Sequence, residues 1–150
     1  MSSADASRRI AIVVSRFNEE VTSGLLVGAR AQLRDSGIEV TDEAVFEAPG
    51  AFEIPLIAQA IARSGRFDGV VCLGCVIKGD TAHFDYISNA ASMGLMTASL
   101  ATGIPLTFGI LTTYTEEQAV LRSRDDVHNK GREAAAACAA SLTTLRRVVN

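Results

Sequence analysis

Runs of apolar and largely β-branched residues recur along the chain, separated by stretches whose apolar residues have helical spacing. The run IAIVV at residues 10–14 is continuous rather than alternating, which is typical of a parallel strand covered on both faces. Further strands are predicted at residues 38–47, 70–77 and 105–112, and helices at 21–34, 52–63, 81–102, 115–124 and 130–148. Strands that alternate with helices form βαβ units with right-handed crossovers, so the sequence predicts a parallel sheet.

The expected architecture is an α/β fold, a flavodoxin-like three-layer α/β/α sandwich with a four-stranded parallel sheet. The 150 residues, 48% of them hydrophobic, are enough for one domain with a substantial core. We expect a short polar N-terminal arm at residues 1–8 and a single domain at residues 9–150.

Charge and composition exclude several classes of partner. The formal net charge is −3 and there is no basic stripe to follow a phosphate backbone, which argues against nucleic acid. No apolar run approaches the roughly 18 residues that a membrane span needs, and the N-terminus lacks an apolar signal region. Three cysteines cannot form a disulfide framework. A cytoplasmic protein without a membrane partner is expected.

Two of the cysteines form a C-x-x-C motif that requires its own interpretation. Cys72 and Cys75 lie within an apolar run with strand character, whereas a redox motif of this kind opens a helix. Residues three apart on a strand point to opposite faces, so the two sulfur atoms should diverge. We interpret both residues, and Cys138 in an Ala-rich stretch, as small buried apolar groups.

Common nucleotide and metal motifs are missing or incomplete. There is no G-x-G-x-x-G, and the Walker A spacing of Gly69 and Gly74 is followed by Cys75 in place of lysine. Glu19 and Glu20 in the turn after the first strand would repel an FMN phosphate. The two histidines, 45 residues apart, make a weak case for a metal site.

Open α/β sheets bind ligands beyond the carboxyl ends of their strands, which directs attention to four turns. In the third turn, Gly79 lets the backbone bend, and Asp80 or Thr81 can cap the helix that follows. The free N–H groups of that helix start form an anion site, with Lys78 beside it. His83 falls in the first helical turn, where the dipole favours a neutral ring suited to acid–base chemistry. An incidental histidine beside a capped helix is the alternative interpretation.

The other turns contribute residues for which both a structural and a binding role stay open. Phe17 in a polar turn is either a stacking platform for a flat ring or a hydrophobic staple. Glu53 near a helix start can accept hydrogen bonds from ligand hydroxyls or simply complement the helix dipole. Arg122 and Arg124 near a helix end would by default be dipole partners on the surface, and Phe108 would by default be core.

Five motifs in one order resemble the lumazine synthase family. They are SRFN after the first strand, APGAFEIP after the second, GCVIKGDTAHFDY at the third, PLTFGILTT at the fourth, and the late NKG. The resemblance extends from about residue 10 to the last helix. It implies condensation of 5-amino-6-(D-ribitylamino)uracil with 3,4-dihydroxy-2-butanone 4-phosphate, with release of phosphate and water. The product would be 6,7-dimethyl-8-ribityllumazine, in the penultimate step of riboflavin biosynthesis, and no metal or redox cofactor is implied.

By the same resemblance, one set of residues would hold the ribitylaminouracil. Phe17 would stack on the uracil ring, with Asn18 beside it. The ribityl chain and the pyrimidine would contact the backbone of Ala51 and Phe52, the carboxylate of Glu53, and main-chain groups of Cys75, Val76 and Ile77.

A second set would act on the butanone phosphate. The resemblance implies that Asp80 and Thr81 bind the phosphate together with Arg122, whose guanidinium suits a phosphate fork. His83 would shuttle protons during imine formation and phosphate loss. Phe108 and Lys130 would come from a neighbouring subunit. Bringing two substrates together supplies most of the acceleration in such a reaction, and no nucleophilic triad is needed.

Two positions depart from the usual family pattern. Lys78 stands where many members have arginine, which keeps the charge but not the planar fork. Leu121 stands where some members carry an acidic residue, so no catalytic carboxylate is assigned.

The resemblance also implies a homo-oligomer, either a pentamer or a multiple of pentamers up to an icosahedral capsid, with association with riboflavin synthase. The sequence leaves the size of the assembly open. Two other interpretations of the chain are a catalytically weak flavin- or lumazine-binding paralogue and a shell-forming protein.

Overall fold

The computed structural model describes residues 8–150, so most of the predicted N-terminal arm lies outside the described residues. All four strands of the sheet run parallel, in the order β2-β1-β3-β4. The strands are β1 (Ile10–Ser15), β2 (Val45–Ala48), β3 (Gly69–Ile77) and β4 (Leu106–Thr113). The helices are α2 (Glu19–Asp35), α3 (Ile54–Arg63), α4 (His83–Thr102), α5 (Glu116–Leu121) and α6 (Lys130–Val149), with 3-10 turns η1 (Asp42–Ala44) and η2 (Ala51–Glu53).

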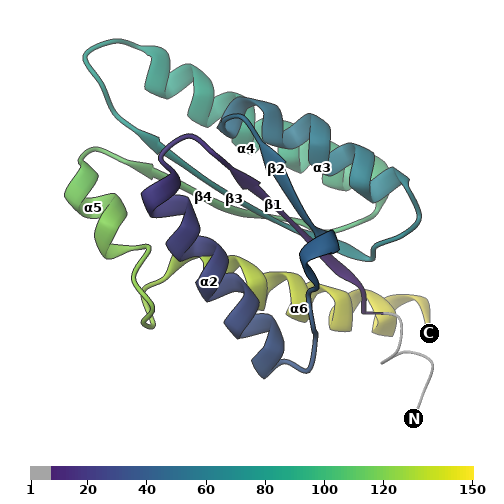
Figure 1. Cartoon of the computed structure of the whole chain (residues 1–150). Coiled ribbons are helices and arrows are strands. Elements are labelled where there is room, and N and C mark those ends of the chain that lie inside the picture. The colour runs from purple at the N-terminus through teal and green to yellow at the C-terminus, as the bar shows by residue number, and fades with distance from the viewer. Residues whose placement is uncertain (1–7) are drawn as a thin grey trace.

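Helices cover both faces of the sheet, which confirms the three-layer α/β/α architecture. Helices α3 and α4 lie on one face and α2 and α6 on the other, while α5 stands beyond the end of β4 (Figure 1). Each face has its own hydrophobic cluster, one between the sheet and α2 and α6, the other between the sheet and α3 and α4. Burial on both faces explains why β1 and β3 read as continuous apolar runs.

The C-x-x-C motif divides between the two clusters. Cys75 belongs to the cluster under α2 and α6, and Cys72 to the cluster under α3 and α4. Both cysteines and Cys138 are buried free thiols. The prediction that the two sulfur atoms diverge and serve packing is therefore confirmed.

The second strand is much shorter than predicted. Residues 38–41 have no regular structure, although Ile38 and Val40 are buried and their neighbours are not. Burial therefore alternates as it does in a strand. The carbonyl of Val40, however, accepts a 2.7 Å hydrogen bond from the Arg30 guanidinium rather than from the backbone of a neighbouring strand. Strand pairing starts only at Val45, opposite Ile12.

Several predicted helix ends also shift. Helix α2 begins at Glu19 rather than residue 21, and α3 begins at Ile54 rather than residue 52. Helix α4 begins at His83 rather than residue 81, and α5 ends at Leu121 rather than residue 124. Within residues 8–150, no helix combines the length and apolar character required to cross a bilayer.

Candidate active site

The turns after β1 and β2 are bonded to each other at the carboxyl edge of the sheet. The backbone N–H of Arg16 donates to the Ala48 carbonyl at 2.8 Å, and that of Phe17 donates to the Pro49 carbonyl at 3.1 Å. This pairing sets Phe17 beside the turn that carries Phe52. Phe17 and Phe52 are 69% and 59% exposed, so neither residue is part of the hydrophobic core. Exposure of Phe17 argues against the staple and leaves its face available to a flat ligand.

Asn18 adopts an unusual backbone conformation that directs its side chain across the edge of the sheet. Its φ of 62° lies in the left-handed region, which asparagine tolerates better than most residues. Its side-chain amide donates a 3.1 Å hydrogen bond to the carbonyl of Cys75 instead of capping α2. The sequence alone did not reveal this conformation or this bond.

The end of β3 extends beyond the part of β1 that pairs with it. The last register pair between these strands is Val14 with Leu73, whereas pairing with β4 continues to Ile77. Cys75, Val76 and Ile77 therefore have a strand neighbour on one side only. Main-chain groups at such a free edge can bind the edge of a heterocycle, and Asn18 occupies the first of them.

The turn after β2 brings a carboxylate to the same edge. In η2, Ala51 is buried and Phe52 exposed, and Glu53 is half-buried. One Glu53 oxygen, Oε1, accepts a 3.0 Å hydrogen bond from the Gly50 N–H, which fixes the side chain. Among the described residues none donates to Oε2, so that oxygen is able to accept bonds from ligand hydroxyls.

The turn after β3 is exposed and opens helix α4. Asp80, Thr81 and His83 are all exposed, and His83 is the first residue of the helix. The Thr81 hydroxyl accepts a 3.3 Å hydrogen bond from the His83 N–H, while the N-cap residue Ala82 provides no side-chain cap. Of the two alternatives that were predicted, Asp80 or Thr81, the structure favours Thr81, which accepts one N–H although Ala82 is the N-cap residue. The Asp85 N–H donates to the Ala82 carbonyl at 3.0 Å, so among the described residues the Phe84 N–H is the first-turn group left to suit an anion.

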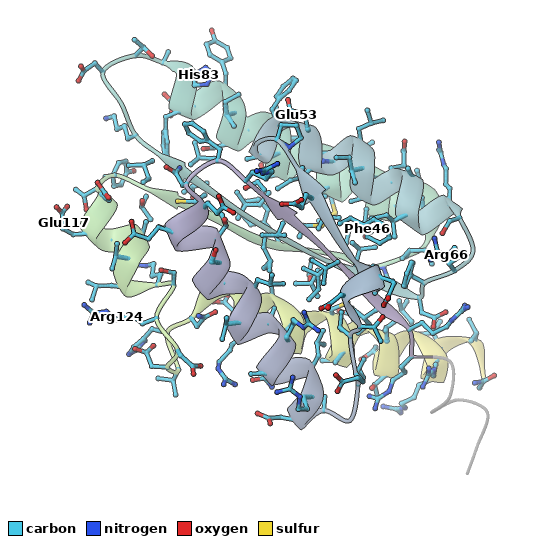
Figure 2. All side chains as sticks on the ribbon, viewed as in Figure 1. Phe46, Glu53, Arg66, His83, Glu117 and Arg124 are labelled. Atoms are coloured by element: carbon cyan, nitrogen blue, oxygen red, sulfur yellow. The ribbon has the colours of Figure 1, made fainter. Side chains whose placement is uncertain are left out.

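A second group of predicted residues lies apart from the first within the chain. Phe108, Arg122 and Lys130 line one hollow of about 910 Å³ at the outer edge of β4, together with α5 and the start of α6. None of Phe17, Asn18, Phe52, Glu53, Asp80, Thr81 or His83 lines this hollow. Figure 2 shows the same division, with His83 and Glu53 in the layer of α3 and α4 and Arg124 in the loop after α5.

The cations of the hollow have local partners that hold them. Arg122 is exposed, and its Nη1 donates to the Gln118 carbonyl at 3.1 Å in the last turn of α5. Lys130 Nζ lies 3.2 Å from Glu133 Oε1. Phe108 is partly buried and packs against the core cluster under α3 and α4, so it belongs to the edge of the core as well as to the hollow.

Tyr114 is a candidate site residue that the sequence analysis did not predict. Its side chain is 68% exposed, and its ring lies 6.1 Å from Phe84 and 5.6 Å from the Lys78 ammonium. The backbone N–H of Lys78 also donates to the Thr113 carbonyl at 2.8 Å. These contacts tie the turn after β3 to the turn after β4. An aromatic residue in a polar turn at the carboxyl edge was the available signal, as it was for Phe17.

Buried thiols in this region are not nucleophiles at neutral pH. Burial raises the pKa of the Cys75 thiol to about 11. A thiol with such a pKa stays protonated near neutrality, and the protonated form is a poor nucleophile. Residues 8–150 place no three His, Cys, Asp or Glu side chains where they could share a metal ion.

Comparison with known proteins gives one family. The sequence model of the family described as 6,7-dimethyl-8-ribityllumazine synthase matches residues 7–146. A protein of Caulobacter vibrioides named 6,7-dimethyl-8-ribityllumazine synthase 1 is 64% identical over 140 residues, covering 93% of this chain and 92% of that protein. Proteins named 6,7-dimethyl-8-ribityllumazine synthase from Protochlamydia amoebophila and Salinibacter ruber are 51% and 46% identical, covering 84% and 93% of this chain and 73% and 90% of their own lengths. The chain therefore belongs to the 6,7-dimethyl-8-ribityllumazine synthase family.

Proposed function

We propose that the chain catalyses the condensation of 5-amino-6-(D-ribitylamino)uracil with 3,4-dihydroxy-2-butanone 4-phosphate, forming 6,7-dimethyl-8-ribityllumazine and releasing phosphate and water. It acts as a transferase in riboflavin biosynthesis. The observation that carries the proposal is the set of three turns at one sheet edge, which offers an exposed ring, a free strand edge and an open helix start in a member of this family. A heterocycle with a polyol chain and a phosphate ester are the ligands that these features suit.

The ribitylaminouracil occupies the half of the site next to β1 and β2. Phe17 stacks on the pyrimidine, and Asn18 lies at its edge, supported by its bond to Cys75. The main chain of Cys75, Val76 and Ile77 faces the heterocycle. The backbone of Ala51 and Phe52 and the free oxygen of Glu53 hold the ribityl hydroxyls.

The butanone phosphate occupies the half next to α4. Its phosphate lies on the free N–H at the start of α4 and on the main-chain N–H groups of Asp80 and Thr81, and the guanidinium of an Arg122 balances its charge. His83, the first residue of α4, has no described side-chain partner and is able to move protons during imine formation and phosphate loss. One acid–base group of this kind contributes roughly 10²–10⁴-fold.

The site is completed by a second copy of the chain. In one chain, Phe108, Arg122 and Lys130 line a hollow that excludes the residues of the other half. A neighbouring subunit in a homopentamer, or in a multiple of pentamers, brings its hollow against the three turns. Association of such an assembly with riboflavin synthase follows from the family and is proposed with it.

The direct test is synthesis of the product. Purified protein is mixed with both substrates, and lumazine formation is followed by fluorescence. Product formation that depends on both substrates supports the proposed function. Tight binding of the product without turnover would instead indicate the catalytically weak binding paralogue, and it would contradict the proposal.

A further inference from the structure

The loop that joins α5 to α6 has no hydrophobic anchor. Between Leu121 and His128 every residue is exposed except the half-buried Ser123, and the apolar Val127 is 89% exposed. The loop nevertheless carries Arg122 at its start and leads directly into Lys130. Its position must therefore be set by polar contacts.

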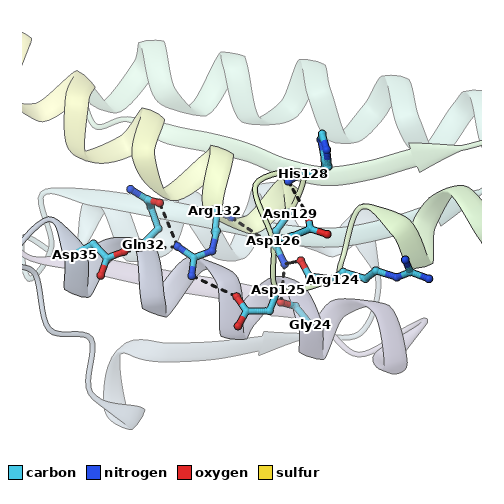
Figure 3. Close-up of polar contacts among 9 residues, drawn as sticks. All are labelled: Gly24, Gln32, Asp35, Arg124, Asp125, Asp126, His128, Asn129 and Arg132. Atoms are coloured by element: carbon cyan, nitrogen blue, oxygen red, sulfur yellow. Dashed lines mark hydrogen bonds and ion pairs between the residues drawn. The ribbon is translucent and has the colours of Figure 1, made fainter.

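Asn129 is the one fully buried residue at the end of this loop, with 1% of its surface exposed. Its Nδ2 donates to the Gly24 carbonyl of α2 at 3.1 Å and to the Arg124 carbonyl of the loop at 2.8 Å (Figure 3). Its Oδ1 accepts from the Arg132 N–H at 3.1 Å and so caps α6. The Asn129 side chain thus joins the loop, α2 and α6, and both its amide nitrogen and its amide oxygen are hydrogen-bonded.

Glycines make room for this side chain between the two helices. A Cβ atom at Gly28 of α2 would overlap the Asn129 amide, and one at Gly131 would overlap the Leu25 carbonyl. A Cβ atom at Gly24 would overlap the carbonyl of Ser123 in the loop. The helices and the loop therefore approach more closely than any side chain at these positions would allow.

The anchored end of the loop connects directly to both cations. The backbone N–H of Lys130, the residue after Asn129, donates to the carbonyl of Arg122 at 2.9 Å. Arg132 adds outer supports, at 3.3 Å from Asp125 and 3.6 Å from Asp35, with a 3.4 Å bond to Gln32. Asp35 and Asp125 are exposed carboxylates, Asp125 within the loop, whereas the Asn129 amide that bonds to the loop is buried.

We propose that Asn129 is a positioning residue for the synthase reaction. Through its two carbonyl bonds it fixes the loop so that Arg122 and Lys130 are held at the spacing required to receive the phosphate-bearing substrate. Asn129 does not touch the substrate, and its effect is exerted through these two cations. This proposal rests on the proposed function and assigns a role that goes beyond capping α6.

The test uses two variants that disturb the bridge in different ways. Asn129→Ser keeps a hydroxyl that can cap α6 but removes both donors to Gly24 and Arg124. Gly28→Ala leaves Asn129 intact and pushes its amide away from α2. For each we expect the KM for the butanone phosphate, and the inhibition constant of inorganic phosphate, to rise about tenfold or more, because small displacements of positioning groups have effects of up to roughly 100-fold. The KM for the ribitylaminouracil should change less than about twofold.

Leu142→Ala is the matched control, since Leu142 is a buried residue on the same helix that lies against Gly69 at the opposite end of the sheet. It should lower stability without changing the ratio of the two KM values. Combined with Arg122→Ala and Lys130→Ala in one chain, Asn129→Ser should raise the KM for the phosphate substrate by less than about twofold further, because both groups that it positions are already gone.

Several outcomes would overturn the proposal. They are a proportional change in both KM values, full additivity with the combined loss of Arg122 and Lys130, or failure of both bridge variants to fold, which would make Asn129 a residue of the fold only. Hydrogen exchange at Arg122 and Lys130 separates this proposal from the proposed function. If the wild type makes no lumazine, the proposed function fails, and unchanged exchange protection of these two amides in Asn129→Ser would show that the bridge does not position the loop either.

Discussion

The side-chain amide of Asn18 donates a 3.1 Å hydrogen bond to the main-chain carbonyl of Cys75, and this bond spans the gap where β3 continues past β1. Asn18 reaches the carbonyl because its backbone is left-handed, with φ at 62°. The bond orders the turn that carries Phe17 against the free strand edge. The predicted uracil half of the site is therefore organised before any ligand binds.

Removing the bond between Asn18 and Cys75 should weaken binding of the ribitylaminouracil in the predicted uracil half of the site. Asn18→Ala combines loss of a partly buried hydrogen bond with an unfavourable left-handed alanine, so we expect about 1–3 kcal/mol of lost stability and a higher KM for the ribitylaminouracil. Urea unfolding and steady-state kinetics measure the two effects. Asn18→Gly is the matched control, because glycine accepts the conformation and lacks only the side chain. An unchanged KM in both variants would show that the bond does not prepare the uracil site.

His83→Ala should slow the reaction without abolishing it. Most of the acceleration comes from holding two substrates together, and the acid–base contribution is about 10²–10⁴-fold. His83 is exposed and has no described side-chain partner, so the variant should keep the wild-type melting temperature. A wild-type rate would refute the role of His83 in proton transfer.

The buried thiols should resist alkylation and make stability fall at alkaline pH. Burial raises the pKa of Cys75 to about 11 and that of Cys138 to about 12, and it raises the pKa of Cys72 as well. Because the folded-state values are raised, the stabilising contribution is complete below the ordinary thiol pKa of about 8.5 and is lost as the pH rises through the folded values. Iodoacetamide at pH 8.5 should label the urea-unfolded chain but not the folded one. In Cys138→Ala the fall in unfolding free energy between pH 8.5 and 10.5 should be smaller, and an identical slope would contradict this explanation.

The fold was largely predictable from the sequence because burial on both faces leaves a simple pattern. The apolar runs of β1 and β3 indicated their elements directly. Residues 38–41 were wrongly predicted as part of a strand, because they alternate between buried and exposed positions as a strand does. The carbonyl of Val40 in this segment accepts a hydrogen bond from the Arg30 side chain, and no local sequence pattern predicts that contact.

The site was predictable to the extent that topology decides it. Turns that follow parallel strands meet at one edge, and this rule predicts Phe17, Glu53 and His83 at that edge, while their roles in a site stay predictions. It could not show that Asn18 is left-handed or that its amide bonds to a carbonyl 57 residues away, because no local pattern encodes that contact. The role of Asn129 escaped for a similar reason. A residue before a helix signals a cap, but its bond to Gly24 depends on how α2 and α6 pack.

The separation of Arg122 from His83 within one chain predicts that a working site combines the two from different subunits. His83→Ala and Arg122→Ala chains should each be slow when assembled alone. When they are unfolded together in equal amounts and refolded into mixed assemblies, random pairing gives about one quarter of the sites both wild-type residues.

The most direct measurement is therefore the rate of lumazine formation, followed by fluorescence, in these mixed assemblies. We predict recovery to about one quarter of the wild-type rate per chain. A mixture no faster than the average of its two parent variants, with wild-type chains active under the same conditions, would contradict a synthase site shared between neighbouring chains.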